Sequence, residues 1–253
     1  MDFEKEEQQH LQQCEDEVEQ RGWVSSDVIR DAIIGLSDGL TVPFALTAGL
    51  SGTGNPRLIV VAGFAELASG AISMGIGGAL GSHAEMQHVS ATRKRVLQRA
   101  MQMTPRAAQQ AIGTVLGPFS VSPRVAKDLA KDLDDDRESL GFFLLKMEEG
   151  LDDKASEQER RRVWQSGLVI GLSYLVGGLI PLLPYVFFST VRHGLACSVL
   201  VTALVLLVFG AVKEKLVGGT GGWRGQLASA LSTLFVGAIA AGSSCVIVRA
   251  LEG

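Results

Sequence analysis

The chain has 253 residues, of which 47% are hydrophobic and 20% charged, and its mean hydropathy is +0.25. This composition is too apolar for an ordinary soluble domain and too charged for a chain made only of membrane helices. The formal net charge of −4 offers no electrostatic basis for binding nucleic acid, so we expect no such partner.

Apolar residues gather in five stretches that are nearly free of charge, at about residues 30–50, 58–81, 163–190, 194–212 and 225–248. A helix needs ~20 apolar residues to cross a hydrocarbon core of ~30 Å. We therefore predict an all-α, polytopic membrane protein with five transmembrane helices. Residues 1–27 would be a cytosolic N-terminal tail, 28–81 the first two spans, and 163–253 the last three.

Residues 82–162 are polar and separate the second span from the third. No breaker follows Gly81, so the second span is expected to continue as one long helix to about Met103, before Pro105. AAQQAIGTVLG is predicted as a short helix, Pro123 opens a further polar stretch, and LGFFLLKMEEGL has helical spacing up to Gly150. Because long structureless connections are uncommon, this insert is predicted to be a compact cytosolic helical domain.

The third span contains Gly167 and Gly171, a GxxxG pair that permits close helix contacts. We expect this span to end at Pro181 and Pro184, because proline interrupts the hydrogen bonding of a helix.

Basic residues predict the orientation of the spans. The loops after the first and third spans hold only Arg57 and Arg192, whereas the loop after the fourth holds Lys213, Lys215 and Arg224. The insert is also rich in Lys and Arg. Since basic residues in short loops favour the cytosolic side, the N-terminus, residues 82–162 and the 213–224 loop are placed in the cytosol.

Asp38 lies inside the first span and is the first candidate for function. An ionisable group in hydrocarbon is costly and rarely accidental. Pro43 follows five residues later and removes the helical hydrogen bond to the carbonyl of Gly39. Two oxygen ligands that face a bundle interior suit a hard or borderline cation. The alternative is a structural aspartate in a kinked helix.

Three other residues would lie near Asp38. Asp31 is seven residues earlier, on the same helix face and ~10 Å away along the axis. Met74 falls at a similar depth on the antiparallel second span, where its thioether would favour transition metals over Mg²⁺ and Ca²⁺ unless it merely packs. Glu66 lies deeper and is either a third ligand, a proton carrier, or a carboxylate bonded to a neighbouring helix.

The insert holds weaker metal candidates. Glu85 and His88 are three residues apart and share a helix face, a spacing that is also common on solvated helices. The remaining acidic candidates are Glu148, Glu149, Asp152, and the face made by Asp128, Asp132, Asp135 and Asp136, for which solvation is the usual reading. No motif such as HExxH or a phosphate-binding loop is present, so we expect no enzyme.

The segments RDAIIGLSDGLTVPFALTAGLSG, AELASGAISMGIGGALGS and GLSYLVGGLIPLLPY closely resemble the vacuolar iron transporter family. The resemblance covers all five spans, about residues 28–250. It implies a proton-coupled transporter that moves Fe²⁺, and in many members Mn²⁺, from the cytosol into a vacuole. It also implies a homodimer in the vacuolar membrane lipid, with its pore at the dimer interface, a cytosolic metal-binding domain, and no resident cofactor.

By matching motifs, the resemblance implies that Asp38 and Met74 are pore ligands and that Glu66 and Asp31 line the pathway or its mouth. In the cytosolic domain it implies the metal ligands Glu85, His88 and Glu148. The sequence departs from the family there. The basic segment ATRKRVLQRAM stands where members carry further glutamates, and Leu144-Leu145 stands where plant members carry two methionines. The alternative function is a non-transporting metal sensor or scaffold that acts through this domain.

Overall fold

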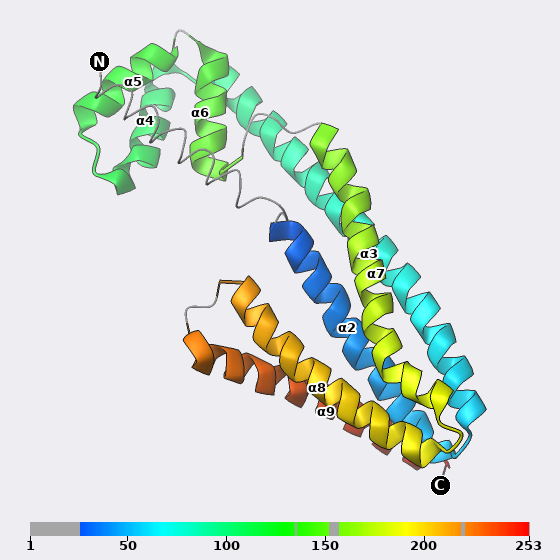
Figure 1. Ribbon diagram of the computed structural model, residues 1–253. Coiled ribbons are helices and arrows are strands. Elements are labelled where there is room, and N and C mark those ends of the chain that lie inside the picture. The colour runs from blue at the N-terminus through cyan, green and yellow to red at the C-terminus, as the bar shows by residue number, and fades with distance from the viewer. Residues whose placement is uncertain (1–25, 135, 152–156, 219–220, 253) are drawn as a thin grey trace, which may run out of the picture. The chain divides into compact units, whose positions relative to one another are not determined.

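The computed structural model describes residues 26–134, 136–151, 157–218 and 221–252 (Figure 1). These residues form eight α-helices and two short 3-10 helices, η1 (Ser51–Thr53) and η2 (Gly117–Phe119), and no strand occurs among them. The predicted all-α class is therefore confirmed for the described residues. The chain divides into two compact units. Among the described residues, the transmembrane unit lies within 26–79 and 164–252, and the insert unit lies within 80–163.

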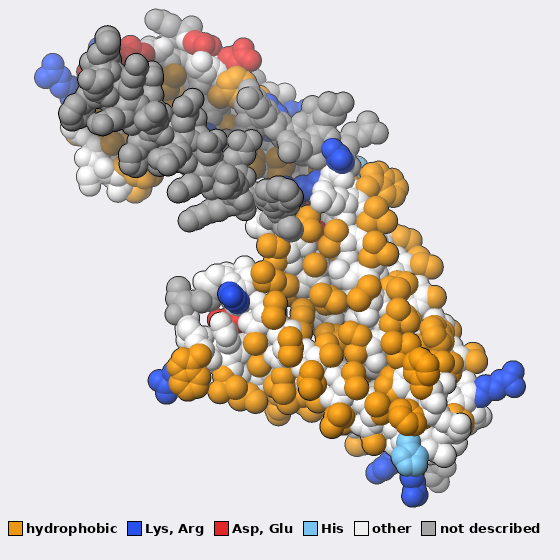
Figure 2. Space-filling view, viewed as in Figure 1, with side chains coloured by type: hydrophobic (Ala, Val, Ile, Leu, Met, Phe, Trp, Pro, Cys, Tyr) orange, Lys and Arg blue, Asp and Glu red, His pale blue; other side chains and the backbone are white. Residues whose placement is uncertain are grey.

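Within the part of the chain that the structure describes, five helices are long and apolar enough to cross a membrane, as predicted. They are α2 (Ser26–Leu50), α3 (Pro56–Gln102), α7 (Glu157–Phe187), α8 (Val191–Leu216) and α9 (Gly222–Glu252). Figure 2 shows hydrophobic side chains over the visible face of the transmembrane unit, with Lys and Arg side chains at its edges. Val61, Leu200 and Phe235 are each more than half exposed. Such outward apolar side chains suit helices that are surrounded by lipid.

Glycines allow α3 and α7 to approach closely. A Cβ atom on Gly171 would lie 2.9 Å from the carbonyl oxygen of Ala71, and one on Gly167 would lie 2.6 Å from that of Gly75. These separations are too short for a side chain, so the two backbones meet directly. The GxxxG pair of the third span therefore packs against α3 of the same chain.

The end of α7 differs from the prediction. The helix does not stop at Pro181 and Pro184 but continues through both to Phe187. A proline removes one intrahelical hydrogen bond, whereas a helix that ends in hydrocarbon leaves several backbone groups without partners. The Ser198 hydroxyl of α8 also donates to the carbonyl oxygen of Pro181 at 2.7 Å, which ties the two helices together at this point.

The insert unit contains the end of α3 and the short helices α4 (Pro105–Leu116), α5 (Pro123–Asp134) and α6 (Arg137–Glu149). Helix α3 is unbroken to Gln102, which confirms the predicted long helix. The side chain of Thr104 caps α4 by accepting a hydrogen bond from the N–H of Ala107 at 3.3 Å. Gly150 ends α6 with a left-handed φ of 67°, a conformation that glycine adopts without strain.

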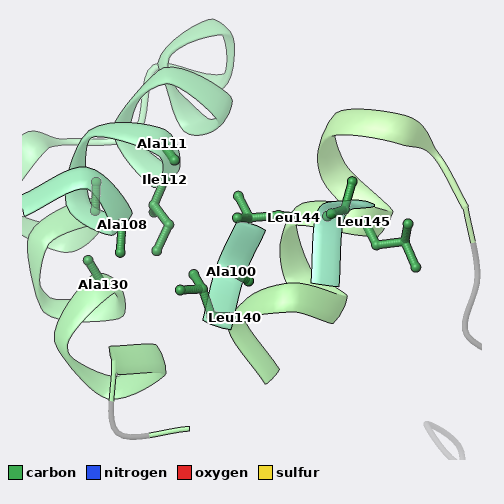
Figure 3. Packing of buried hydrophobic residues seen from close by; sticks show 10 residues of the cluster. Ala100, Ala108, Ala111, Ile112, Ala130, Leu140, Leu144 and Leu145 are labelled. Carbon is green, nitrogen blue, oxygen red and sulfur yellow. The ribbon is translucent and has the colours of Figure 1, made fainter. Parts of the chain in front are cut away.

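Apolar side chains from four helices form the core of the insert unit. Figure 3 shows Ala108, Ile112 and Ala130 gathered on one side, with Leu140 and Leu144 opposite them. Leu144 and Leu145 are 0% and 1% exposed. This leucine pair therefore serves as packing, and leucine has no donor atom for a metal.

Candidate functional site

Tyr174 lies at the point where α2, α3 and α7 meet. A Cβ atom on Gly39 of α2 would lie 2.9 Å from the Cα atom of Tyr174. One on Gly70 of α3 would lie 2.6 Å from the Tyr174 hydroxyl oxygen. Two glycines on different helices thus make room for the backbone and the ring of this tyrosine, which is 3% exposed.

Glu66 of α3 is held by Tyr174. The phenol hydroxyl donates a hydrogen bond to Oε1 of Glu66, whereas Oε2 is buried and has no hydrogen-bond partner. A buried carboxylate oxygen without a donor is energetically costly. A proton or a metal ion at Oε2 would supply the missing partner. Of the roles expected for Glu66, the hydrogen bond to a neighbouring helix is present, and one oxygen remains for a ligand.

Asp38 is the middle residue of α2, and its side chain is exposed in the single protomer. Its side chain makes no hydrogen bond or ion pair with the described residues, and the next residue, Gly39, packs against the backbone of Tyr174. Tyr174 therefore contacts both Glu66 and the residue that follows Asp38. An unpaired carboxylate halfway along a spanning helix cannot face lipid without a large free-energy cost, so this face must meet water, an ion or another protein surface.

Met74 of α3 is partly buried and packs against the cluster formed by Leu67, Tyr174 and Leu182. Its position next to this cluster places it in the same region as Glu66 and Asp38. The packing role considered from the sequence is therefore real. It does not conflict with metal binding, because a thioether can pack through its carbons and still present sulfur to a soft or borderline cation.

Asp31 is 3% exposed and lies near the start of α2. Its Oδ1 accepts hydrogen bonds from Nε and Nη2 of Arg30 at 3.3 Å and 3.2 Å. Arg30 is also 3.6 Å from Oδ1 of Asp27. A guanidinium thus neutralises Asp31, which makes it a weaker ligand than Asp38 unless the ion pair opens.

The candidates of the insert unit are dispersed. Glu85, His88 and Glu149 are exposed on their helices, and Asp152 lies outside the described residues. Glu148 forms an ion pair with Arg99, with Oε2 and Nη1 3.0 Å apart. Of the acidic face, Asp136 caps α6, Asp128 and Asp132 are exposed, and Asp135 is outside the described residues. Metal binding by these residues stays a prediction.

No group of three or more His, Cys, Asp or Glu side chains in the described ranges is placed to hold a metal ion. Asp38 and Glu66 are therefore not part of a cluster of that size in the single protomer.

A sequence model of the VIT family matches residues 29–249, nearly the whole chain. The chain belongs to the VIT family. The resemblance drawn from the sequence motifs is confirmed. In this VIT chain the matched region includes all five candidate spans and the insert unit between them.

The sequences of named relatives align with the VIT chain over most of its length. Vacuolar iron transporter 1 of Tulipa gesneriana is 38% identical over 237 residues, which are 93% of this chain and 92% of that protein. Protein CCC1 of Saccharomyces cerevisiae is 40% identical over 233 residues, 90% of this chain and 70% of that protein. Vacuolar iron transporter 1 of Arabidopsis thaliana is 33% identical over 234 residues, 92% of this chain and 90% of that protein. The family is one of membrane transporters rather than enzymes, as predicted.

Sequence reasoning on this VIT chain did not single out Tyr174. A signal was available, because a tyrosine within an apolar span has a hydroxyl that must find a partner in the bundle. Tyr174 also lies three residues after Gly171 and three before Gly177, a spacing that marks a closely packed helix face. Its partner on α3 could not be read from that pattern.

Proposed function

We propose that this chain moves Fe²⁺ from the cytosol into a vacuole in exchange for protons, with Mn²⁺ as a second cargo. The names of the VIT relatives support iron as cargo and the vacuolar membrane as location. The observation that carries the proposal is the arrangement around Tyr174. Tyr174 donates to the half-paired carboxylate of Glu66 and packs with the partly buried Met74, and its backbone meets Gly39, the residue after the unpaired carboxylate of Asp38.

The chemistry of this donor set selects the cargo. Carboxylate oxygens bind hard and borderline divalent ions, and a thioether adds affinity for transition metals but little for Mg²⁺ or Ca²⁺. Asp38 and Met74 are proposed to bind the metal, while Glu66 is proposed to take a proton when the metal leaves. Metal ligands must be deprotonated, so a carboxylate that alternates between the two ions couples their movements.

The pathway is proposed to open at Asp31 on the cytosolic side. Arg30 holds this carboxylate, and an arriving divalent cation would compete with the guanidinium for it. The orientation rests on the basic residues of the loops, which favour a cytosolic N-terminus, a cytosolic insert unit and a cytosolic 213–224 loop.

We also propose that the working form is a homodimer. Asp38 is exposed in the single protomer although it lies at the middle of a spanning helix. A second copy would cover this face and contribute its own Asp38 and Met74, giving the passing ion more ligands than one protomer offers. This arrangement would remove the cost of exposing a carboxylate to lipid.

The test is metal uptake by purified protein in proteoliposomes with an acidic lumen. Fe²⁺, Mn²⁺, Zn²⁺ and Ca²⁺ are compared, and a pH-sensitive dye in the lumen reports proton exit. We expect Fe²⁺ and Mn²⁺ uptake that needs the gradient and is accompanied by proton efflux. Uptake that ignores the gradient would contradict exchange, and no uptake of any metal would favour the sensor or scaffold function.

A further inference from the structure

The insert unit contains a cavity of about 840 Å³ that is largely open to solvent and is lined by residues of α3, α4 and α6. Small-molecule sites in proteins have volumes of roughly 300–1,000 Å³, so the cavity could hold a small organic or inorganic ligand. Its α3 wall is made by Arg95, Gln98, Arg99 and Gln102. Spacings of three, four and seven residues place these four side chains on one helix face.

All four of these side chains donate hydrogen bonds, and the two arginines are also positively charged. Each guanidinium offers five N–H groups and each glutamine amide two. Thr104, the residue before α4, and Thr114 of α4 line the same cavity. Thr104 accepts from the N–H of Ala107, which leaves its own O–H to donate. The first turn of α4 adds the partial positive charge of a helix N-terminus.

Glu148 is the one carboxylate among the described residues that line the cavity, and Arg99 already pairs with it at 3.0 Å. Because Glu148 balances only Arg99, the charge of Arg95 gives the residues that line the cavity a net positive charge. A divalent cation would meet two guanidiniums and one carboxylate that is already engaged. An anion would meet donors from both walls, and Arg99 has enough N–H groups to bind Glu148 and an anion together.

We propose that this cavity binds a phosphate group, held between the guanidiniums of Arg95 and Arg99. The planar guanidinium fork matches the oxygens of phosphate and forms short, charge-assisted hydrogen bonds with them. The phosphate belongs either to a soluble compound or to a lipid headgroup. The metal site that the family resemblance implies at Glu148 is the opposing assignment for the same cavity, because the two ligands require opposite charge.

The test uses the full-length chain in detergent, titrated calorimetrically with inorganic pyrophosphate and, separately, with Mn²⁺ at low ionic strength. We expect pyrophosphate to bind and added salt to weaken that binding. Arg95→Gln should weaken binding roughly tenfold, since it removes charge-assisted hydrogen bonds. Arg99→Gln/Glu148→Gln, which removes the pair together, should weaken it by a similar factor.

Arg124→Gln is the matched control, because Arg124 is an exposed arginine on α5 that does not line the cavity. It should bind pyrophosphate like the wild type. An equal loss in Arg124→Gln would overturn the site, since the effect would then come from net charge. Absence of pyrophosphate binding, or Mn²⁺ binding that is lost in Glu148→Gln, would also overturn it and favour a metal at this place.

Arg95 and Arg99 are exposed, so their substitution should leave the core of the insert unit unchanged. An unaltered elution volume of the variants in size-exclusion chromatography would verify this.

A second arm identifies the source of the phosphate. The chain is placed in nanodiscs of phosphatidylcholine with or without phosphatidylinositol 4-phosphate, and pyrophosphate is titrated again. Weaker pyrophosphate binding in the second nanodiscs would assign the cavity to a lipid headgroup. Equal binding in both would assign it to a soluble phosphate compound.

Discussion

The hydroxyl of Tyr174 on α7 donates a hydrogen bond to Oε1 of Glu66 on α3, while Oε2 of Glu66 is buried without a partner. This contact joins a residue of the proposed pathway to a helix that contributes no candidate ligand of its own. In the proposed pathway Tyr174 would therefore be a positioning residue. It fixes one oxygen of Glu66 and leaves the other for a proton or a metal ion.

Tyr174→Phe removes the donor and keeps the ring. We expect Fe²⁺ uptake to fall roughly tenfold, because a hydrogen bond to a charged group is worth about 1.5–3 kcal/mol. Tyr185→Phe is the control on the same helix. Its hydroxyl lies 3.0 Å from that of Ser51, away from Glu66, so uptake should be unchanged. Initial uptake rates in proteoliposomes measure both.

The coupling of Tyr174 and Glu66 can be measured with a double-mutant cycle. If the hydroxyl acts through Glu66, the Tyr174→Phe/Glu66→Gln variant should transport no more slowly than Glu66→Gln alone. Simple multiplication of the two single losses would mean that Tyr174 affects transport by another route.

Asp38→Ala should reduce metal uptake to the background of empty liposomes, because it removes the unpaired carboxylate from the middle of α2. The variant should still fold, since no hydrogen bond or ion pair of the described residues depends on this side chain. Asp128→Ala, a loss of the same charge at an exposed site on α5, is the control. Normal uptake by Asp38→Ala would remove this residue from the pathway.

Met74→Leu keeps the apolar volume beside Leu67, Tyr174 and Leu182 but removes the sulfur. Such a swap usually costs less than about 1.5 kcal/mol of stability. We expect stable protein whose preference for Fe²⁺ and Mn²⁺ over Ca²⁺ is weaker. The readout is uptake of one metal in competition with another. An unchanged metal profile would leave Met74 with a packing role alone.

Gly39→Ala should destabilise the transmembrane unit by about 1–3 kcal/mol, because overpacking forces neighbouring atoms to move. Its Cβ atom would overlap the backbone of Tyr174, which cannot rotate away as a side chain could. Gly242→Ala is the control, since nothing lies within 4 Å of a Cβ atom built there. The midpoint of thermal aggregation, followed by size-exclusion chromatography, should fall for the first variant and stay unchanged for the second.

The hydrogen bonds of Asp136 predict that the stability of α6 in the insert unit depends on pH. Hydrogen bonds from the Ser139 hydroxyl and from the N–H groups of Ser139 and Glu138 hold the pKa of Asp136 below its usual value of 3.8. A lowered folded-state pKa means that the ionised cap stabilises α6 above pH 3.8, and that this contribution is lost as the pH falls through the folded-state pKa.

Hydrogen exchange at the start of α6 measures this effect. At pH 7, Asp136→Ala should exchange faster than the wild type, and the difference should shrink below pH 3.8. Asp132→Ala, which removes an exposed carboxylate of α5, should exchange like the wild type at both pH values. A difference that persists in acid would show that the charge of Asp136 does not carry the stabilisation.

The sequence alone determined the five spans, the long helix α3 and the residues that carry the family motifs. These features depend on local properties: the length of an apolar run, the position of a proline, or a carboxylate within such a run. Asp38, Glu66 and Met74 could be nominated for that reason. The continuation of α7 through Pro181 and Pro184 could not, because it depends on the cost of ending a helix in hydrocarbon.

Only the tertiary structure decided which groups face these candidates. Tyr174 and Glu66 are 108 residues apart in the chain, and Arg99 and Glu148 are 49 apart. Such pairs form only when the glycine faces of α3 and α7, or the apolar faces of α3 and α6, pack in one register. The order of residues determines which helices form. Contact between helix faces determines whether a carboxylate meets a phenol, meets a guanidinium or remains without a partner.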